Sequence, residues 1–180
     1  MRRLIGISIL PLALALLVGA AGCKRRPQKV EVQATDEETQ DLETMVHVAD
    51  PRGSLQLVRG FHDVEQSAWR WTMKKFSVTL RPPAGAAQNG ATLQLKFAVP
   101  DPVIERLKDI TLVAKVQGVP LEAETCRKPG EYTYTRDVPA RAFSGDAITV
   151  DFALDKVLPP SASDNRELGI VVSSVGFEAK

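Results

Sequence analysis

Hydrophobic and polar residues alternate with a period of two along the chain from Leu55 onward. Successive side chains of a β-strand point to opposite faces, so this alternation predicts strands with one buried and one exposed face. The runs that follow the pattern are residues 76–80, 92–99, 110–116, 132–135 and 148–154. A further run, residues 168–177, is apolar on both faces and is typical of a central strand.

Short segments rich in proline, glycine, asparagine and aspartate separate these runs, as expected for turns between strands. The helical signal is confined to one turn, Val103 to Leu107, which leaves no room for the crossover helices of a parallel sheet. The sequence therefore predicts an all-β domain over residues 55–180, folded as an antiparallel β-sandwich or jelly roll.

The two tryptophans of the chain lie two residues apart, just ahead of one predicted strand. In an uninterrupted strand, Trp69 and Trp71 would point to the face opposite the apolar residues of the 76–80 run, and would form a platform for a ligand. If the chain turns at residues 73–75, the tryptophans can join the core instead. We expect such a turn, with Trp71 buried and Trp69 nearer the surface, because large aromatic side chains are usually buried.

The first 22 residues have the features of an export signal. Two arginines precede an apolar stretch, which ends in the small residues before Cys23. The order Ala20-Ala21-Gly22-Cys23 resembles a bacterial lipobox, in which the signal is removed after Gly22 and the thiol of Cys23 is lipidated. An uncleaved membrane anchor and an ordinary secretory signal are the alternatives, since the apolar run is about long enough to span a bilayer.

Residues 23–54 have the composition of a flexible linker that follows the lipidated cysteine. They begin with a basic stretch, continue with five acidic residues between Asp36 and Glu43, and contain no aromatic residue. Once the signal is removed, 21 Lys and Arg remain against 22 Asp and Glu, a net charge of about −1. The mature chain therefore lacks the basic excess that holds nucleic acid, and we expect no nucleic-acid partner.

Motifs of known enzyme classes are missing from the sequence. It contains no Gly-rich phosphate loop, no G-x-S-x-G elbow and no Cys or His pair at zinc spacing. We therefore expect no catalytic residue, no metal and no cofactor. Cys126 is the one cysteine that lipidation of Cys23 would leave. The adjacent Arg127 and Lys128 could lower its pKa, although an inert, half-buried thiol is the simpler interpretation.

Three segments of the chain occur in an order that resembles a bacterial β-sandwich module. They are residues 60–65 (GFHDVE), 69–72 (WRWT) and 166–170 (RELGI). The module has the pattern G-F/Y-x-x-E…W-R-W-T and is found in small lipoproteins and beside envelope glycosyltransferases. The resemblance covers residues 56–178 and implies a galactose-binding-like or jelly-roll fold in a glycan-related context, although the biochemical role of that family is poorly defined. By motif position, the candidate ligand-binding residues are Glu65, Trp69, Arg70, Trp71, Arg166 and Glu167.

The charged candidates fit structural ion pairs equally well, Glu65 with Arg70 or Arg166 with Glu167.

We expect a non-catalytic, lipid-anchored protein of the bacterial cell envelope that faces the periplasm or the exterior and recognises a glycan. The alternative is a structural or assembly module that docks another envelope protein. In lipoproteins of Gram-negative systems, an aspartate directly after the lipidated cysteine retains the protein at the inner membrane. This chain has Lys24 at that position, and by its likeness to those lipoproteins the absence of aspartate favours the outer membrane.

Overall fold

The computed structural model describes residues 41–180. The predicted signal peptide, the lipidation site Cys23 and the first part of the predicted linker lie outside the described residues. Within the described part, no helix is both long and apolar enough to cross a membrane.

The described part of the chain is an antiparallel all-β fold, which confirms the predicted fold class. Its elements are β1 (Met45–His47), η1 (Pro51–Gln56), β2 (Leu57–Glu65), β3 (Trp69–Leu80), α1 (Ala86–Asn89), β4 (Ala91–Val99), α2 (Asp101–Leu107), β5 (Ile110–Val116), β6 (Val119–Pro120), β7 (Glu124–Cys126), β8 (Gly130–Val138), η2 (Ala140–Ala142), β9 (Ile148–Leu154) and β10 (Val171–Ala179).

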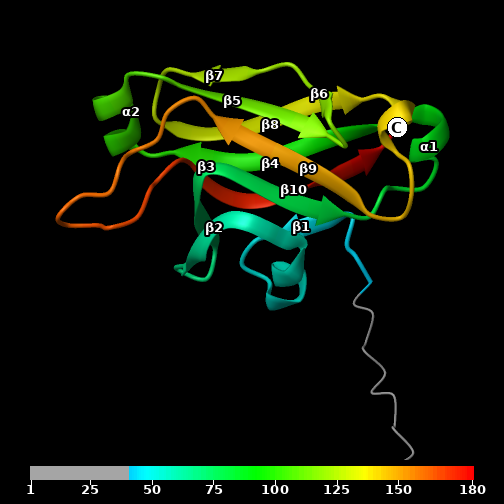
Figure 1. The fold of residues 1–180 in the computed structure, drawn as a ribbon, viewed down its shortest axis with the longest axis horizontal. Coiled ribbons are helices and arrows are strands. Elements are labelled where there is room, and N and C mark those ends of the chain that lie inside the picture. Colours follow the sequence, from blue (N-terminus) through cyan, green and yellow to red (C-terminus); the bar gives the residue numbers. More distant parts are fainter. Residues whose placement is uncertain (1–40) are drawn as a thin grey trace, which may run out of the picture. The chain divides into compact units, whose positions relative to one another are not determined.

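The strands form one curled sheet whose two halves face each other as the layers of a sandwich. The strand order is β6-β5-β9-β3-β10-β4-β8, and β1, β2 and β7 pair at the side with β10, β3 and β5. The long strand β3 belongs to both layers, since it pairs with β10 near its start and with β9 along its second half. In Figure 1 the two short helices α1 and α2 lie at opposite ends of the strands.

The core fills the space between the two layers. Each alternating run that the sequence predicted points its apolar residues inward, so that the burial of β9 and the start of β4 alternates strictly. The rings of Phe76 and Phe152 stack at a centroid distance of 4.8 Å, and those of Phe143 and Phe177 meet edge to face at 5.1 Å. Such apolar burial is the main stabilising contribution to a fold of this size.

The predicted turn at residues 73–75 is wrong, because β3 continues through them without a break. The chain does not reverse there; instead, its pairing partner changes from β10 to β9. Thr72 and Phe76 are both fully buried, so the inward face of the strand keeps its parity across the change. Trp69 and Trp71 therefore point to the outer face, and Trp71 is not fully buried as predicted but half-buried, packed against the core.

The predicted boundary between linker and domain at Leu55 is too late in the chain. β1 pairs with β10 from Met45 to His47, and Val46 and Val48 are fully buried. Asp50 caps the following 3-10 turn, and Gln56 accepts a hydrogen bond from the backbone N–H of Glu43 at 2.9 Å. The sequence signal was weak here because a three-residue strand is too short to display alternation.

Candidate functional site

A groove with a volume of about 520 Å³ lies on the outer face of the layer formed by β3, β10, β4 and β8. The strand register builds it from two rows of side chains. In the first row, Val171 lies opposite Trp71 on one side and Ala98 on the other, and Ala98 lies opposite Glu131. The second row is offset by two residues on each strand, earlier on β3 and β4 and later on β10 and β8. It consists of Trp69, Ser173, Lys96 and Thr133.

Differences in side-chain size between neighbouring strands hollow out the groove. Trp69 and Trp71 stand on β3, whereas the adjacent β10 and β4 present the small residues Val171, Ser173 and Ala98. A β-bulge between Val172 and Ser174 shifts the register of β10, and Ser173 is exposed there. A ligand lying along β10 would therefore have the indole rings on one flank and a small, partly apolar floor beneath it.

The hairpin between β2 and β3 places Glu65 next to the tryptophans, since Glu65 pairs with Trp69. The backbone N–H of Ala68 donates to the carbonyl of Glu65 at 3.1 Å, which closes a β-turn. Its central residues, Gln66 and Ser67, have φ values of 50° and 55°. Positive φ at both positions is the feature of type I′ hairpin turns, which favour Asn and Gly.

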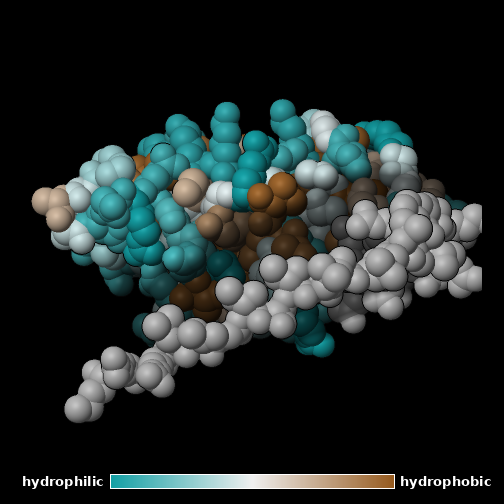
Figure 2. Space-filling view, turned by 60° about the horizontal axis from the view of Figure 1, so that its bottom comes forward, coloured by the Kyte–Doolittle hydropathy of each residue, from teal (hydrophilic) through white to brown (hydrophobic). Residues whose placement is uncertain are grey.

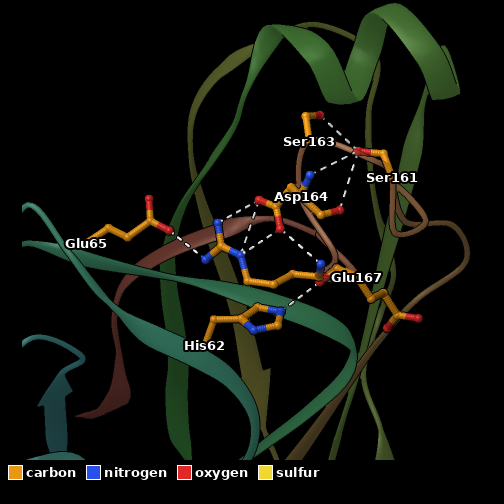
Figure 3. A network of polar contacts seen from close by, with 7 residues as sticks. His62, Glu65, Ser161, Ser163, Asp164 and Glu167 are labelled. Atoms are coloured by element: carbon orange, nitrogen blue, oxygen red, sulfur yellow. Dashed lines mark hydrogen bonds and ion pairs between the residues drawn. The ribbon is translucent and has the colours of Figure 1, made fainter.

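Glu65 is held at the rim of the groove by Arg166, whose guanidinium is itself clamped by Asp164 (Figure 3). Nη1 of Arg166 donates to Oε1 of Glu65 at 2.7 Å, and Nη2 donates to Oδ2 of Asp164 at 2.8 Å. The hydrogen bonds from the side chain and backbone of Arg166 lower the pKa of Asp164 to about 2. The hydrogen bond to Asp164, and to a lesser extent the one to Glu65, raises the pKa of Arg166 above its ordinary value.

Three of the predicted site residues, Arg166, Arg70 and Glu167, lie outside the groove lining. Arg166 contacts the lining residue Glu65, whereas Arg70 and Glu167 make structural contacts elsewhere. Arg70 points to the face opposite the tryptophans, where Nε donates to the carbonyl of Val48 at 2.7 Å and Nη1 to that of His62 at 3.0 Å. Glu167 accepts a hydrogen bond from the backbone N–H of Lys74 at 2.6 Å. The ion pair that forms joins Glu65 to Arg166, rather than Glu65 to Arg70 or Arg166 to Glu167.

The flank of the groove across from the tryptophans carries two charges. Lys96 on β4 and Glu131 on β8 are exposed, and they sit diagonally on neighbouring strands, since Lys96 pairs with Thr133 and Ala98 with Glu131. Within residues 41–180, neither side chain makes an ion pair or a side-chain hydrogen bond. Both remain available to polar groups of a ligand.

Sequence reasoning found one wall of the groove and missed the rest. The W-R-W-T motif marked the tryptophans, and the parity of the strand indicated that they share a face. Lys96 and Ala98 occupy outward positions of the predicted strand at residues 92–99, and Glu131 lies just before the predicted strand at residues 132–135. Their place beside the tryptophans depends on β10 lying between β3 and β4, which a single sequence does not reveal.

Cys126 is buried at the end of β7, not half-exposed in a turn, and forms no disulfide within the described residues. Burial, and then the charge of Glu124, raise the pKa of its thiol to about 11. Arg127 and Lys128 therefore do not lower the pKa of this thiol, which stays protonated at neutral pH. No group of three or more His, Cys, Asp or Glu within residues 41–180 is arranged to hold a metal ion.

Four large apolar side chains of the described residues are exposed outside the groove, namely Leu55, Val58, Met73 and Val113. Leu55 on η1 is 77% exposed and Val58 on β2 is 56% exposed. Figure 2 likewise shows apolar residues among a largely hydrophilic surface. Exposed apolar residues are common on the surfaces of folded domains, so we assign no role to these four.

Comparisons with known proteins give a fold likeness and no family. A scan against models of known protein families finds no match, and no curated protein matches the chain. Among solved structures, the chain is similar to the CBM36-1 domain of a multidomain xylanase from the hindgut metagenome of Trinervitermes trinervoides. The TM-score is 0.40 at 10% sequence identity, and the match covers 76% of this chain and 97% of that domain.

Proposed function

We propose that this protein is a non-catalytic, lipid-anchored component of the bacterial cell envelope that binds a glycan in the groove between Trp69 and Glu131. The observation that carries the proposal is the position of the two tryptophans. Both line an open groove on the outer face of β3 and stay partly exposed, although Trp71 also packs against the core. Two large aromatic side chains that remain partly exposed beside a groove are well suited to contact a ligand.

The chemistry of the groove suits a sugar better than a purely apolar ligand. Indole faces stack on the C–H surfaces of a pyranose ring, and carboxylate and hydroxyl groups exchange hydrogen bonds with its hydroxyls. Glu65 lies next to Trp69, while Ser173 and Thr133 supply hydroxyls on the floor and the far flank. Apolar and polar surfaces therefore alternate over the dimensions of a small oligosaccharide.

The envelope location rests on the sequence around Cys23. The lipobox-like order of residues 20–23 supports lipidation of the thiol, and attachment of two or more acyl chains would anchor the protein stably. Lys24 supports the outer membrane as its destination. Cys23→Ala should abolish incorporation of labelled fatty acid and release the protein from the membrane fraction. Retention of the variant with its label would contradict the anchor.

Glycan binding is tested with the full-length chain purified in detergent. A glycan array identifies ligands, and calorimetry measures their affinity for the wild type, Trp69→Ala and Trp71→Ala. We expect each substitution to weaken binding at least about tenfold, since stacked aromatic residues often dominate such sites. Leu55→Ala removes an exposed apolar side chain outside the groove and should leave affinity unchanged. If both tryptophan variants bind as the wild type does, the groove is not the binding site.

The alternative, docking of another envelope protein, is favoured by one feature of the sheet. β8 is the last strand in the sheet order and, within residues 41–180, pairs with β4 alone. Its outer backbone edge could therefore accept an added strand from a partner. Two results together would favour docking over glycan binding. One is a protein that co-purifies with the wild type and is lost in the variant Thr133→Pro, and the other is the absence of any signal on glycan arrays.

A further inference from the structure

The groove carries two separate groups of charged side chains. The first group is Glu65, which lines the groove beside the tryptophans, together with Arg166 and Asp164, which lie outside the lining and join Glu65 through ion pairs. The second group is Lys96 with Glu131, which line the far flank. The balance of charge within each group determines which ligands the groove accepts, because like charges at close range repel and an unpaired charge is costly to cover.

The first group has more carboxylates than cations. Arg166 faces two carboxylates, and its contacts with Asp164 are the more numerous. Nε of Arg166 lies 3.0 Å from Oδ1 and 3.2 Å from Oδ2 of Asp164, and Nη2 lies 2.8 Å from Oδ2. One guanidinium thus balances one of the two carboxylates, and a net negative charge remains beside Trp69.

Glu65 has an oxygen left for a ligand. Only Oε1 accepts a hydrogen bond from Arg166, and within residues 41–180 no donor reaches Oε2. Figure 3 shows the second oxygen of Glu65 directed away from the guanidinium. A carboxylate oxygen accepts hydrogen bonds and has no proton to donate, so Oε2 suits a hydroxyl or amide N–H of a ligand and repels a second carboxylate.

The second group is balanced. Lys96 and Glu131 have opposite charges and occupy diagonal positions on neighbouring strands, so that each offsets the field of the other. An acidic ligand would gain from Lys96 but would meet Glu131 on the same flank and Glu65 on the opposite flank. Over the whole groove, negative charge is therefore in excess.

We propose that the groove takes an uncharged sugar, and that Glu65, fixed by Arg166, discriminates against sugars that carry a carboxylate. This inference rests on the proposed glycan binding and adds the class of glycan to it. Neutral hexoses and N-acetylhexosamines fit the groove, whereas uronic acids do not. In this arrangement Arg166 is a positioning residue, since it acts on the ligand through the orientation of Glu65.

The test uses two pairs of probes that differ mainly in charge. They are the β-1,4-linked tetramer of glucose with its glucuronate counterpart, and the methyl ester of tetragalacturonate with the free acid. Binding to the full-length chain is followed by tryptophan fluorescence at pH 8, at low and at high salt. In the pair that binds, we expect the neutral member to bind at least about fivefold more tightly at low salt, and the difference to shrink as salt screens the repulsion.

Two variants separate discrimination from binding. Glu65→Gln keeps the shape of the side chain and should reduce the preference for the neutral probe to near one. Glu105→Gln removes the same charge from the exposed side of α2, outside the groove, and should leave the preference unchanged. Arg166→Lys should weaken the preference as well, because an ammonium cannot hold Glu65 and Asp164 in the same planar geometry.

The experiment distinguishes a failure of the inference about charge from a failure of the proposed glycan binding. If acidic probes bind as tightly as neutral ones or more tightly, or if the array returns only acidic glycans, glycan binding stands and the inference about charge is wrong. A preference that survives Glu65→Gln unchanged also overturns the inference, since another residue would then discriminate. If no glycan binds at all, the proposed function fails and the inference fails with it.

Discussion

The two faces of β3 have the same backbone and opposite roles. On the inner face, Thr72, Phe76, Val78 and Leu80 are all fully buried. On the outer face, Trp69 and Trp71 are only half-buried and line the groove. The inner face is constrained by packing, because any lost volume leaves a cavity. At the start of the strand the outer face is partly exposed, so Trp69 and Trp71 are less constrained by packing than the residues of the inner face.

The largest expected effect concerns stability on the inner face. Phe76→Ala removes a ring that stacks on Phe152 and meets Phe61 edge to face, and should lower the free energy of unfolding by about 3 to 5 kcal/mol. Trp69→Ala should lower it by about 1 kcal/mol. Urea unfolding followed by circular dichroism measures both. Equal losses in the two variants would mean that Trp69 belongs to the core and would remove the contrast between the faces.

Gly60 allows β2 to cross closely over the point where β3 changes partner. Its φ is +76°, and a Cβ atom there would lie 2.1 Å from the carbonyl oxygen of Lys75 and 2.7 Å from Cα of Phe76. Gly60→Ala should therefore cost more than about 2 kcal/mol.

The matched control for Gly60 is Gly118, which has a φ of +81° and no heavy atom within 4 Å of an added Cβ. Gly118→Ala isolates the cost of the left-handed backbone, about 1 kcal/mol. Thermal melts of the two variants give the difference. A Gly60→Ala variant no less stable than Gly118→Ala would show that the two strands are not in close contact.

The turn that joins Glu65 to Trp69 should become more stable when a strained residue is replaced. Ser67 has a φ of 55°, a conformation that costs an L-residue about 1 kcal/mol and glycine almost nothing. Ser67→Gly should raise the free energy of unfolding by about that amount and leave glycan affinity within about twofold, since the register of the hairpin is kept. A less stable variant would indicate that Ser67 makes a contact that outweighs the strain.

The smallest expected effect is a pH dependence at the edge of the groove. The pKa of Asp164 is lowered to about 2 in the folded protein by hydrogen bonds from Arg166. The unfolded value is near 4, so the ionised side chain stabilises the fold above about pH 4 and loses that contribution as pH falls towards 2.

Asp164→Asn should therefore melt below the wild type at pH 6, and the two melting temperatures should converge at pH 2. Asp63→Asn serves as the control, because Asp63 makes no ion pair or side-chain hydrogen bond within residues 41–180 and its substitution should have little effect at either pH. A gap between Asp164→Asn and the wild type that is the same at pH 2 and pH 6 would mean that the carboxylate charge does not stabilise the loop.

Alternation alone predicted most of the sandwich. The strands β5 and β9 begin and end where the pattern places them, and the single helical turn became α2. What failed depended on context beyond one strand. Nothing in residues 73–75 distinguishes a turn from a strand that passes between layers, because both need exposed polar side chains at Lys74 and Lys75. The strand β1 was not predicted because its burial comes from pairing with β10, far along the chain.

The candidate site was predictable only where one segment carried it. Trp69, Trp71 and Glu65 come from a single hairpin, whereas Lys96, Glu131 and Ser173 come from three other strands. The ion pair between Glu65 and Arg166 joins residues about a hundred positions apart, whereas the pairs that the sequence suggested, Glu65 with Arg70 and Arg166 with Glu167, join near neighbours. Register and strand order, which the sequence does not encode locally, decided among them.

We propose that the outer face of β3 binds a ligand and that its inner face stabilises the fold. The direct measurement is calorimetric titration of Trp69→Ala and the wild type with the tightest neutral glycan from the array, on the samples used for the urea unfolding curves. For Trp69→Ala we expect at least a tenfold loss of affinity with about 1 kcal/mol lost in stability. Unchanged affinity together with a loss of several kcal/mol would contradict the proposal, because Trp69 would then support the fold and not a ligand.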